Sequence, residues 1–423
     1  MKMDGLPIQG KLFKGDIGME TNCSPESVGL CSKRLKRIRP WIQRYLDEGK
    51  LPGATTLVAR KGQVVFCESL GFGDIEANKP LRVDSIHRFY SMTKPVTSVA
   101  AMMLYEQGLF QLDDPVAKFI PDFKDMQVYI EGAGNDMITK PANNLITIKH
   151  LLTHTSGLTY GFFNADVISN LYTQNHTDFN ANDGTLEQVI ARLVKLPLAF
   201  EPGSRWNYGV STDVLCRLVE IWSGQTFDQY LKQKIFEPLN MQDTGFFVPK
   251  NKIDRFVSLY EVTDENPMAL SDPSQTSFSI GSVQTFSGGA GLLSTLGDYF
   301  KFTELLRGKG EFDGVRLLGR KTIEFMTCNH LPGDLAEMGQ ATFNETTFEG
   351  IGFGLGFSVM IDPAKACIMG SPGEYAWGGA ASTAFWIDPV EDMTVIFLTQ
   401  LRPSSAYPIR RELRVLTYQA IID

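Results

Sequence analysis

The feature that most constrains the fold is a pair of strand-like hairpins, one near each end of the chain. Residues 54–59 and 64–68 are mostly apolar or β-branched, and Lys61-Gly62 joins them in a tight turn. Residues 382–387 and 393–399 repeat the pattern around a polar turn near the other end. Hairpin strands run antiparallel, and elements this far apart share one core only where the chain ends meet. The pattern therefore predicts one antiparallel sheet built from both ends of the chain.

The middle of the chain lacks the strand pattern of the two ends. Residues 116–285 mix helical periodicity with long polar loops, and a last amphipathic helix begins near Pro408. This order of elements indicates an α+β fold, with an antiparallel sheet flanked by helices and a mostly helical inserted domain. We expect an N-terminal extension over 1–25, a sheet domain formed by 26–115 and 286–423, and a helical domain over 116–285.

Composition excludes several classes of function. The chain of 423 residues has a net charge of −8 and no basic surface of the kind that binds nucleic acid, so we expect no nucleic-acid partner. No apolar run approaches the ~20 residues that span a bilayer, and no signal peptide is recognisable. The six cysteines are scattered without close pairs, which argues against a disulfide framework or a zinc ribbon. We expect a cytoplasmic protein without a membrane span.

Ser91-Met-Thr-Lys94 is the first candidate for chemistry. Residues i and i+3 share one face of a helix, so a serine hydroxyl and a lysine amine can meet at a helix start. The helix macrodipole there disfavours the ammonium form of Lys94. A serine nucleophile activated by a neutral lysine fits this arrangement. A helix-capping serine followed by a surface lysine gives the same pattern, so the motif needs corroboration.

Two further segments supply that corroboration. Tyr208 lies in a tight loop before an amphipathic helix, although alone it fits a packing tyrosine. The second segment, residues 377–380, reads Trp-Gly-Gly-Ala and leads into the strand predicted over 382–387. Paired glycines at a strand start permit a ligand to approach the backbone closely, although an ordinary turn has the same composition.

The three segments, in this order and spacing, resemble the serine β-lactamase/penicillin-binding superfamily. The chain looks most like the family VIII carboxylesterases, the branch related to class C β-lactamases. Three more segments match that family, namely 151–158, 236–245 and 288–299, and the resemblance runs from about residue 26 to the end. It implies a β-lactamase-like fold.

The resemblance also implies roles for individual residues. Ser91 matches the nucleophile, and Lys94 matches its partner in the Ser-x-x-Lys motif. Tyr208 matches the tyrosine of the Tyr-x-Asn motif, although Val210 stands where lactamases carry asparagine. By the same analogy, the backbone N–H groups of Ser91 and Ala380 form the oxyanion hole. Whether Lys94 or Tyr208 is the base stays open, because both have unperturbed pKa values of roughly 10.

Trp377, Gly378 and Gly379 stand where lactamases have Lys-Thr-Gly, and the resemblance makes them substrate-binding residues. Tryptophan replaces a cation with an apolar face, which favours a neutral ester over an anionic lactam. His150 and His154 have zinc-like spacing but lack the glutamate of a His-Glu-x-x-His motif, so we interpret them as structural.

The predicted activity is therefore a serine hydrolase that cleaves short-chain carboxylic esters through an acyl-enzyme. Its partner would be a small-molecule ester, and we expect no metal and no cofactor. Two kinds of enzyme stay open beside it: a β-lactamase or D-aminoacyl peptidase, and an acyltransferase that passes the acyl group to an alcohol. A non-catalytic binding module is disfavoured, because Ser91, Lys94 and Tyr208 are all present.

Overall fold

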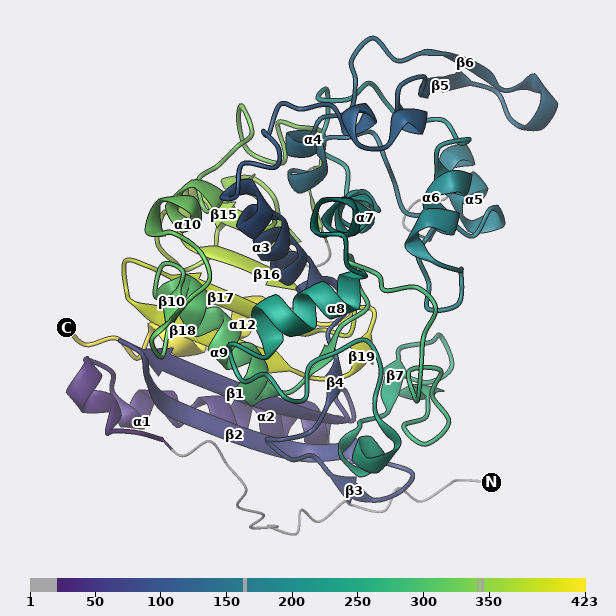
Figure 1. Ribbon diagram of the computed structural model, residues 1–423. Coiled ribbons are helices and arrows are strands. Elements are labelled where there is room, and N and C mark those ends of the chain that lie inside the picture. The colour runs from purple at the N-terminus through teal and green to yellow at the C-terminus, as the bar shows by residue number, and fades with distance from the viewer. Residues whose placement is uncertain (1–20, 163–165, 341, 344–345) are drawn as a thin grey trace, which may run out of the picture.

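The computed structural model describes residues 21–162, 166–340, 342–343 and 346–423, so residues 1–20 of the predicted N-terminal extension lie outside the described residues. An eight-stranded sheet runs through the molecule (Figure 1). In order across the sheet, its strands are β14 (Ile351–Phe353), β15 (Ser358–Met360), β16 (Tyr375–Gly378), β17 (Ala384–Asp388), β18 (Met393–Leu398), β1 (Gly53–Arg60), β2 (Gln63–Asp74) and β3 (Lys79–Pro80).

Both predicted hairpins are present, and they lie next to each other. Lys61 and Gly62 take left-handed φ angles of 54° and 73° between β1 and β2, the geometry that a two-residue hairpin turn requires. β1 pairs with β18 in antiparallel register from Thr55 opposite Leu398 to Arg60 opposite Met393. The prediction that the two chain ends build one antiparallel sheet is therefore confirmed.

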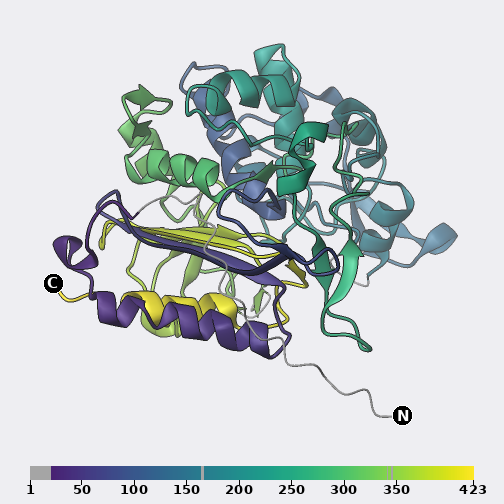
Figure 2. The same cartoon turned by 90° about the horizontal axis from the view of Figure 1, so that it is seen from below.

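Helices cover both faces of this sheet (Figure 2). One face carries elements from the two ends of the chain: the 3₁₀ turn Pro25–Val28, α1 (Ser32–Leu35), α2 (Ile38–Asp47) and α12 (Ile409–Tyr418). The opposite face carries the helices of the middle of the chain together with α3 (Thr93–Tyr105) and α9 (Leu296–Arg307). Side chains alternate along β1, so Leu57 packs in the core on one face and Val58 in the core on the other.

The middle of the chain is largely helical, with short strands at its borders. Its helices are α4 (Ile148–Leu152), α5 (Val167–Gln174), α6 (Leu186–Leu193), α7 (Ser211–Ser223) and α8 (Phe227–Leu231), with a π-helical turn over Lys232–Phe236 and 3₁₀ turns over Val116–Lys118, Pro121–Phe123, Gly134–Asp136 and Lys250–Arg255. A hairpin of β5 (Gln127–Glu131) and β6 (Ile138–Pro141) protrudes at the upper right of Figure 1. The domain boundaries at 116 and 285 stay a prediction.

The remaining elements are short. A small sheet joins β19 (Leu401–Arg402), β7 (Leu259–Glu261) and β8 (Ala269–Asp272). Two-stranded pairs are formed by β4 (His87–Arg88) with β9 (Leu293–Ser294), β10 (Glu311–Phe312) with β11 (Val315–Arg316), and β12 (Thr342–Phe343) with β13 (Thr346–Thr347). The last helices are α10 (Arg320–Met326) and α11 (Pro363–Ala366). Among the described residues, no helix is long and apolar enough to cross a membrane.

One local prediction needs correction. The glycines Gly378 and Gly379 do not begin the strand predicted over 382–387. Residues 375–378 form a strand of their own, β16, and the two glycines end it before the turn to β17. The paired glycines therefore lie at the end of β16, where the chain turns toward β17, and it is at this strand end that they permit another group to approach the backbone closely.

Arg60, at the end of β1, ties the two ends of the chain together. Its side chain is buried and donates hydrogen bonds to the carbonyl oxygens of Val28 and Gly29, each at 3.0 Å. It also pairs with the carboxylates of Asp423 at 2.6 Å and Glu391 at 2.9 Å. One guanidinium therefore joins the N-terminal segment, the turn after β17 and the last residue of the chain.

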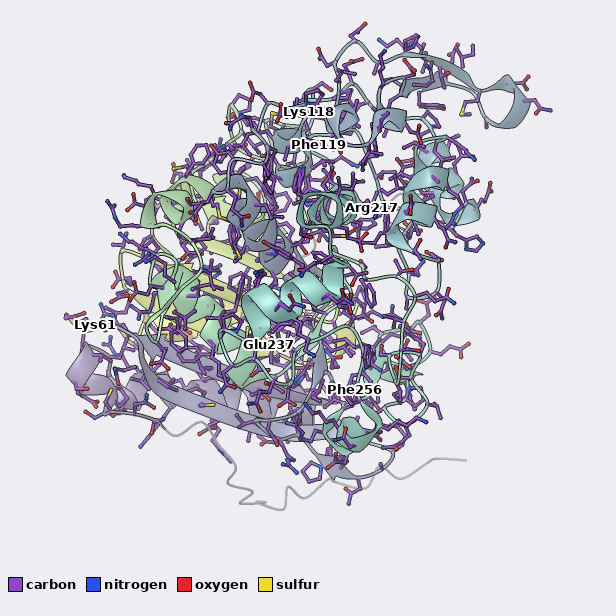
Figure 3. All side chains as sticks on the ribbon, in the orientation of Figure 1. Lys61, Lys118, Phe119, Arg217, Glu237 and Phe256 are labelled. Atoms are coloured by element: carbon purple, nitrogen blue, oxygen red, sulfur yellow. The ribbon has the colours of Figure 1, made fainter. Side chains whose placement is uncertain are left out.

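We predict that Arg60→Met lowers the free energy of unfolding by about 1–3 kcal/mol, because the buried carbonyl of Val28 loses its donor. Lys61→Met is the matched control. Lys61 lies at the periphery (Figure 3), is half-exposed and reaches the same Asp423 only at 3.4 Å, so its loss should change stability by less than about 0.5 kcal/mol. Urea unfolding followed by tryptophan fluorescence measures both, and equal midpoints for the two variants would contradict this role of Arg60.

Candidate active site

Ser91 lies in the 3₁₀ turn Tyr90–Met92, directly before α3. Tyr90 takes a left-handed φ of 45°, which is uncommon for a residue other than glycine and signals a sharp local bend. The hydroxyl of Tyr299 donates to the carbonyl oxygen of Met92 at 2.9 Å and anchors the turn from α9. Ser91 is thereby held at the start of a buried helix, as the sequence predicts.

Lys94 is buried on the first turn of α3, and its amine is surrounded by hydrogen-bond acceptors. In the ammonium form, its Nζ donates to the hydroxyl of Tyr160 at 2.8 Å, to the carbonyl oxygen of Gly289 at 2.9 Å and to Ser91 Oγ at 3.4 Å. The Gly289 carbonyl can only accept, so one N–H must point there. A neutral amine has two N–H groups and one lone pair, so with the second N–H on Tyr160 the lone pair faces Ser91 Oγ.

Burial makes the neutral form of this lysine accessible. Desolvation lowers the pKa of Lys94 from its ordinary value, and the charge of Asp213 opposes that shift. Desolvation likewise raises the pKa of Asp213, which Lys94 and hydrogen bonds from Ser287 and Gly289 oppose. A lysine in this surrounding loses its proton at a lower pH than one in water.

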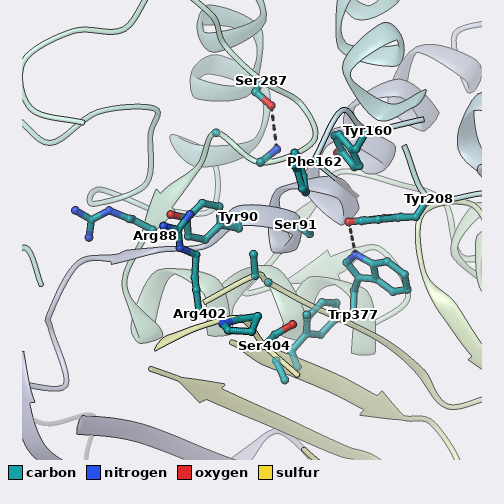
Figure 4. Close-up of a pocket in the computed structure, with 18 of the residues that line it drawn as sticks. Arg88, Tyr90, Ser91, Tyr160, Phe162, Tyr208, Ser287, Trp377, Arg402 and Ser404 are labelled. Carbon is teal, nitrogen blue, oxygen red and sulfur yellow. Dashed lines mark hydrogen bonds between the residues drawn. The ribbon is translucent and has the colours of Figure 1, made fainter. Parts of the chain in front are cut away.

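Tyr208 and Trp377 lie next to each other on the side of the cavity that carries Ser91 (Figure 4). Trp377 Nε1 donates to the hydroxyl of Tyr208 at 3.4 Å, and Lys94 Nζ lies 4.4 Å from the centroid of the Tyr208 ring. Burial raises the pKa of Tyr208 well above its ordinary value, and hydrogen bonds from Ser91 and Trp377 oppose the shift only in part. Tyr208 is therefore a protonated phenol at neutral pH.

The strand end after Trp377 passes very close to the turn before Ser91. A Cβ on Gly379 would collide with the carbonyl oxygen of Phe89 and with Thr383 Oγ1, so only glycine fits there. Ser91 and Ala380 line one cavity, together with Gly378 and Gly379. The two residues named from the sequence for an oxyanion hole thus line the same cavity, and their role stays a prediction.

That cavity has a volume of about 1080 Å³. Much of its wall is aromatic: Tyr160, Phe162, Tyr208, Phe246, Phe278, Phe348 and Trp377. Phe162 is stacked on Tyr160 and is 71% exposed, so it lies where the cavity opens to solvent. The aromatic part of the wall suits an apolar portion of a small molecule, and charged side chains such as Arg88 and Arg402 line other parts of the cavity.

The sequence of this chain is similar to a known family and to characterised relatives. The family model described as Beta-lactamase matches residues 38–419. The chain belongs to the Beta-lactamase family. It is 30% identical over 383 residues to "Esterase EstB" of Burkholderia gladioli, covering 86% of this chain and 89% of the relative. It is 29% identical over 394 residues to "Monacolin J acid methylbutanoyltransferase" of Aspergillus terreus, covering 88% and 92%.

Among solved structures, the fold is similar to that of "EstCE1, a hydrolase with promiscuous acyltransferase activity". The TM-score is 0.73 at 27% identity, with 94% of this chain and 99% of the other covered. The resemblance to the serine β-lactamase superfamily and the β-lactamase-like α+β fold are thereby confirmed. The family contains both hydrolases and acyltransferases among the relatives of this chain.

Two residues of this Beta-lactamase family site were missed from the sequence: Tyr160 and Asp213. Tyr160 lies two residues beyond the segment 151–158 and Asp213 five residues after Tyr208, and neither is part of a motif named from the sequence. Tyr160 is recognised only because its hydroxyl contacts Lys94, 66 residues away in the chain. Asp213 follows Tyr208 by one and a half helical turns, and only the fold brings it to residues 287–289.

His150 and His154, which the sequence analysis interprets as structural, have different surroundings. His150 Nδ1 accepts a hydrogen bond from the backbone N–H of Thr147 and caps α4. His154 is buried with its ring 4.9 Å from that of Tyr208, and burial lowers its pKa well below the ordinary value. No group of three or more metal-ligating side chains occurs within the described parts of the chain.

We predict that Tyr160→Phe lowers kcat about tenfold with a small change in KM, because Lys94 loses an acceptor that orients its lone pair. Steady-state kinetics with p-nitrophenyl butyrate measures the effect. Tyr230→Phe is the matched control: this tyrosine is also buried, but its hydroxyl has no hydrogen bond to any described residue. Wild-type kcat in Tyr160→Phe would refute the orienting role.

Proposed function

We propose that this protein is a carboxylesterase of the family VIII type that hydrolyses short-chain esters through an acyl-enzyme on Ser91. The observation that carries the proposal is the buried amine of Lys94, with Ser91 Oγ, the Tyr160 hydroxyl and the Gly289 carbonyl as its three hydrogen-bond partners. This arrangement supports a neutral lysine that faces a serine hydroxyl at the wall of an aromatic cavity. The cytoplasmic location expected from the sequence stays a prediction.

In the proposed reaction, Ser91 Oγ attacks the ester carbonyl carbon and its proton moves to the lone pair of Lys94 Nζ. The new Oγ–C bond gives a tetrahedral intermediate, whose collapse breaks the bond to the leaving alkoxide. The alkoxide takes a proton from the Lys94/Tyr208 pair and departs as the alcohol. Water then attacks the acyl carbonyl carbon and gives a proton to the Lys94/Tyr208 pair. The second tetrahedral intermediate collapses with cleavage of the Oγ–C bond, Ser91 Oγ takes that proton back, and the acid leaves.

The pKa directions favour Lys94 as the base and Tyr208 as the proton donor of the pair. Desolvation lowers the pKa of Lys94, whereas it raises the pKa of Tyr208. A tyrosine that holds its proton can donate to the leaving oxygen, and a lysine that has lost its proton can accept from Ser91. The two groups lie close enough to titrate as a unit.

The proposed oxyanion hole consists of the backbone N–H groups of Ser91 and Ala380. Both residues line the cavity, and the close packing of Gly379 on the Phe89 carbonyl keeps the two segments together. Each such donor contributes on the order of 3 kcal/mol to stabilisation of the tetrahedral intermediate. Trp377, Gly378 and Gly379 would form the adjoining wall for the substrate.

An acyltransferase is the second candidate. Two relatives of this chain carry acyltransferase activity in their names, and the aromatic wall of the cavity can exclude water from the acyl-enzyme while it admits an alcohol. Hydrolysis and transfer share the acyl-enzyme and differ only in the group that attacks it. Product analysis with and without a primary alcohol in the reaction distinguishes them, since transfer yields a new ester instead of the acid.

We predict that Ser91→Ala abolishes turnover of p-nitrophenyl butyrate and labelling by a fluorophosphonate, because only the nucleophilic oxygen is removed. Intact mass and peptide mapping should place the label on Ser91 in the wild type. Thr93→Ala removes a hydroxyl two residues away and serves as control, since Thr93 Oγ1 accepts only from the backbone of Leu292 in the described chain. Ser91→Ala activity within tenfold of wild type would refute the assignment.

We also predict that kcat/KM for p-nitrophenyl butyrate exceeds that for nitrocefin by more than about tenfold, equivalent to about 1.4 kcal/mol. Trp377 has no positive charge that could pair with the carboxylate of a lactam, and Val210 has no amide that could hydrogen-bond the side chain of the lactam. Trp377→Lys should narrow this ratio and Trp377→Phe should preserve it. Equal or better turnover of nitrocefin by the wild type would replace the esterase assignment with a lactamase.

A further inference from the structure

The two oxygens of the buried Asp213 carboxylate differ in their hydrogen bonding. Asp213 lies on the first turn of α7, and its Oδ1 accepts hydrogen bonds from Ser287 Oγ at 2.6 Å and from the backbone N–H of Gly289 at 2.9 Å. Its Oδ2 is buried and has no hydrogen-bond partner among the described residues. A buried carboxylate oxygen without a donor is costly, so its retention points to a purpose other than stability.

Gly289 connects this carboxylate to Lys94. Its backbone N–H donates to Asp213 Oδ1, and its carbonyl oxygen accepts from Lys94 Nζ at 2.9 Å. A Cβ on Gly289 would collide with Asp213 Oδ2 and lie 2.9 Å from the hydroxyl of Tyr160. One glycine is therefore enclosed by the carboxylate, the phenol and the amine, and no side chain separates them.

We propose that Asp213 is a positioning residue for the reaction: it orients the Gly289 carbonyl toward Lys94, and its charge sets the pH at which Lys94 gives up its proton. This inference rests on the proposed function, since it assumes that neutral Lys94 accepts the proton of Ser91. Asp213 itself touches neither the substrate nor Ser91 in this scheme and acts only through Lys94.

The groups around this pair leave Asp213 as the principal charge that acts on Lys94. Burial holds Tyr160 and Tyr208 protonated by raising their pKa values, and it holds His154 neutral by lowering its pKa. The thiol of Cys216, on the same helix as Asp213, stays protonated because burial raises its pKa. Asp178 is the other carboxylate that acts on Asp213 and Tyr160, from the segment after α5.

The sign of the effect follows from these charges. The negative charge of Asp213 stabilises the ammonium form of Lys94 and so raises its pKa, against the effect of burial. Removal of that charge should lower the pKa of Lys94 further. Because the reaction needs the neutral amine, the acid limb of the pH profile of kcat/KM should then move to lower pH.

The experiment compares the pH dependence of kcat/KM for p-nitrophenyl butyrate in wild type and Asp213→Asn. The amide keeps one acceptor oxygen for Ser287 and Gly289 but loses the charge, so we expect the acid limb to move down by about one pH unit. Asp298→Asn is the matched control. It removes another buried carboxylate on the first turn of a helix, which accepts from the backbone of Asp243, and should leave the limb in place.

The outcomes separate this inference from the function on which it rests. Wild type that is neither active nor labelled at Ser91 would refute the proposed function. An active wild type whose acid limb coincides with that of Asp213→Asn would leave Asp213 a merely structural role and overturn this inference. If Asp213→Asn does not fold, Ser287→Ala decides. Loss of the 2.6 Å hydrogen bond raises the pKa of Asp213, so the carboxyl group carries its charge only at higher pH and supports the ammonium form of Lys94 less. A smaller shift in the same direction supports the inference, and an unmoved limb overturns it.

Discussion

The antiparallel pairing of β1 with β18 is the constraint on which the rest of the structure depends. It joins residues more than 300 positions apart, from Thr55–Leu398 to Arg60–Met393. Closing a loop of that length costs about 5 kcal/mol in chain entropy, which the apolar cores on both faces of the sheet offset. Ser91 follows the N-terminal strands and Trp377 precedes the C-terminal ones, so the site comes together only when this pairing forms. This pairing thereby brings the turn that carries Ser91 and the strand that carries Trp377 into one domain.

Within this frame, the burial of Lys94 organises the chemistry. An amine removed from water favours its neutral form, and the acceptors around it then decide where its lone pair points. Tyr160 and Gly289 take the two N–H groups, which leaves the third direction for Ser91. Tyr208 is buried beside Lys94, and there desolvation has the opposite effect on the pKa: it raises the pKa of the phenol and keeps it protonated. One apolar environment thus lowers the pKa of the amine and raises the pKa of the phenol, as the proposed mechanism requires.

How much could be predicted from the sequence depends on how local each signal is. The hairpins could be predicted because alternation and turn residues lie within a few positions, and Ser91, Lys94 and Tyr208 because their motifs are short. The strand β16 was missed and the two glycines were assigned to the start of the next strand, since Gly378 and Gly379 are compatible with either end of a strand. The contacts of Tyr160 and Asp213 with their partners could not be predicted. They depend on how α3, α7 and residues 287–289 pack, and no pattern within any one of these segments encodes that packing.

The contact between Gly379 and the Phe89 carbonyl has a consequence for how this enzyme can change. The backbone at that point is fixed by direct main-chain packing, whereas the side chain two residues earlier, at Trp377, faces the cavity without supporting that contact. A substitution at 377 can therefore leave the main-chain contact between Gly379 and Phe89 in place, although it removes the hydrogen bond from Trp377 to the Tyr208 hydroxyl. A library randomised over residues 377–380 should yield active clones that are diverse at 377 and uniform at 379, which makes this strand end a natural entry point for directed evolution.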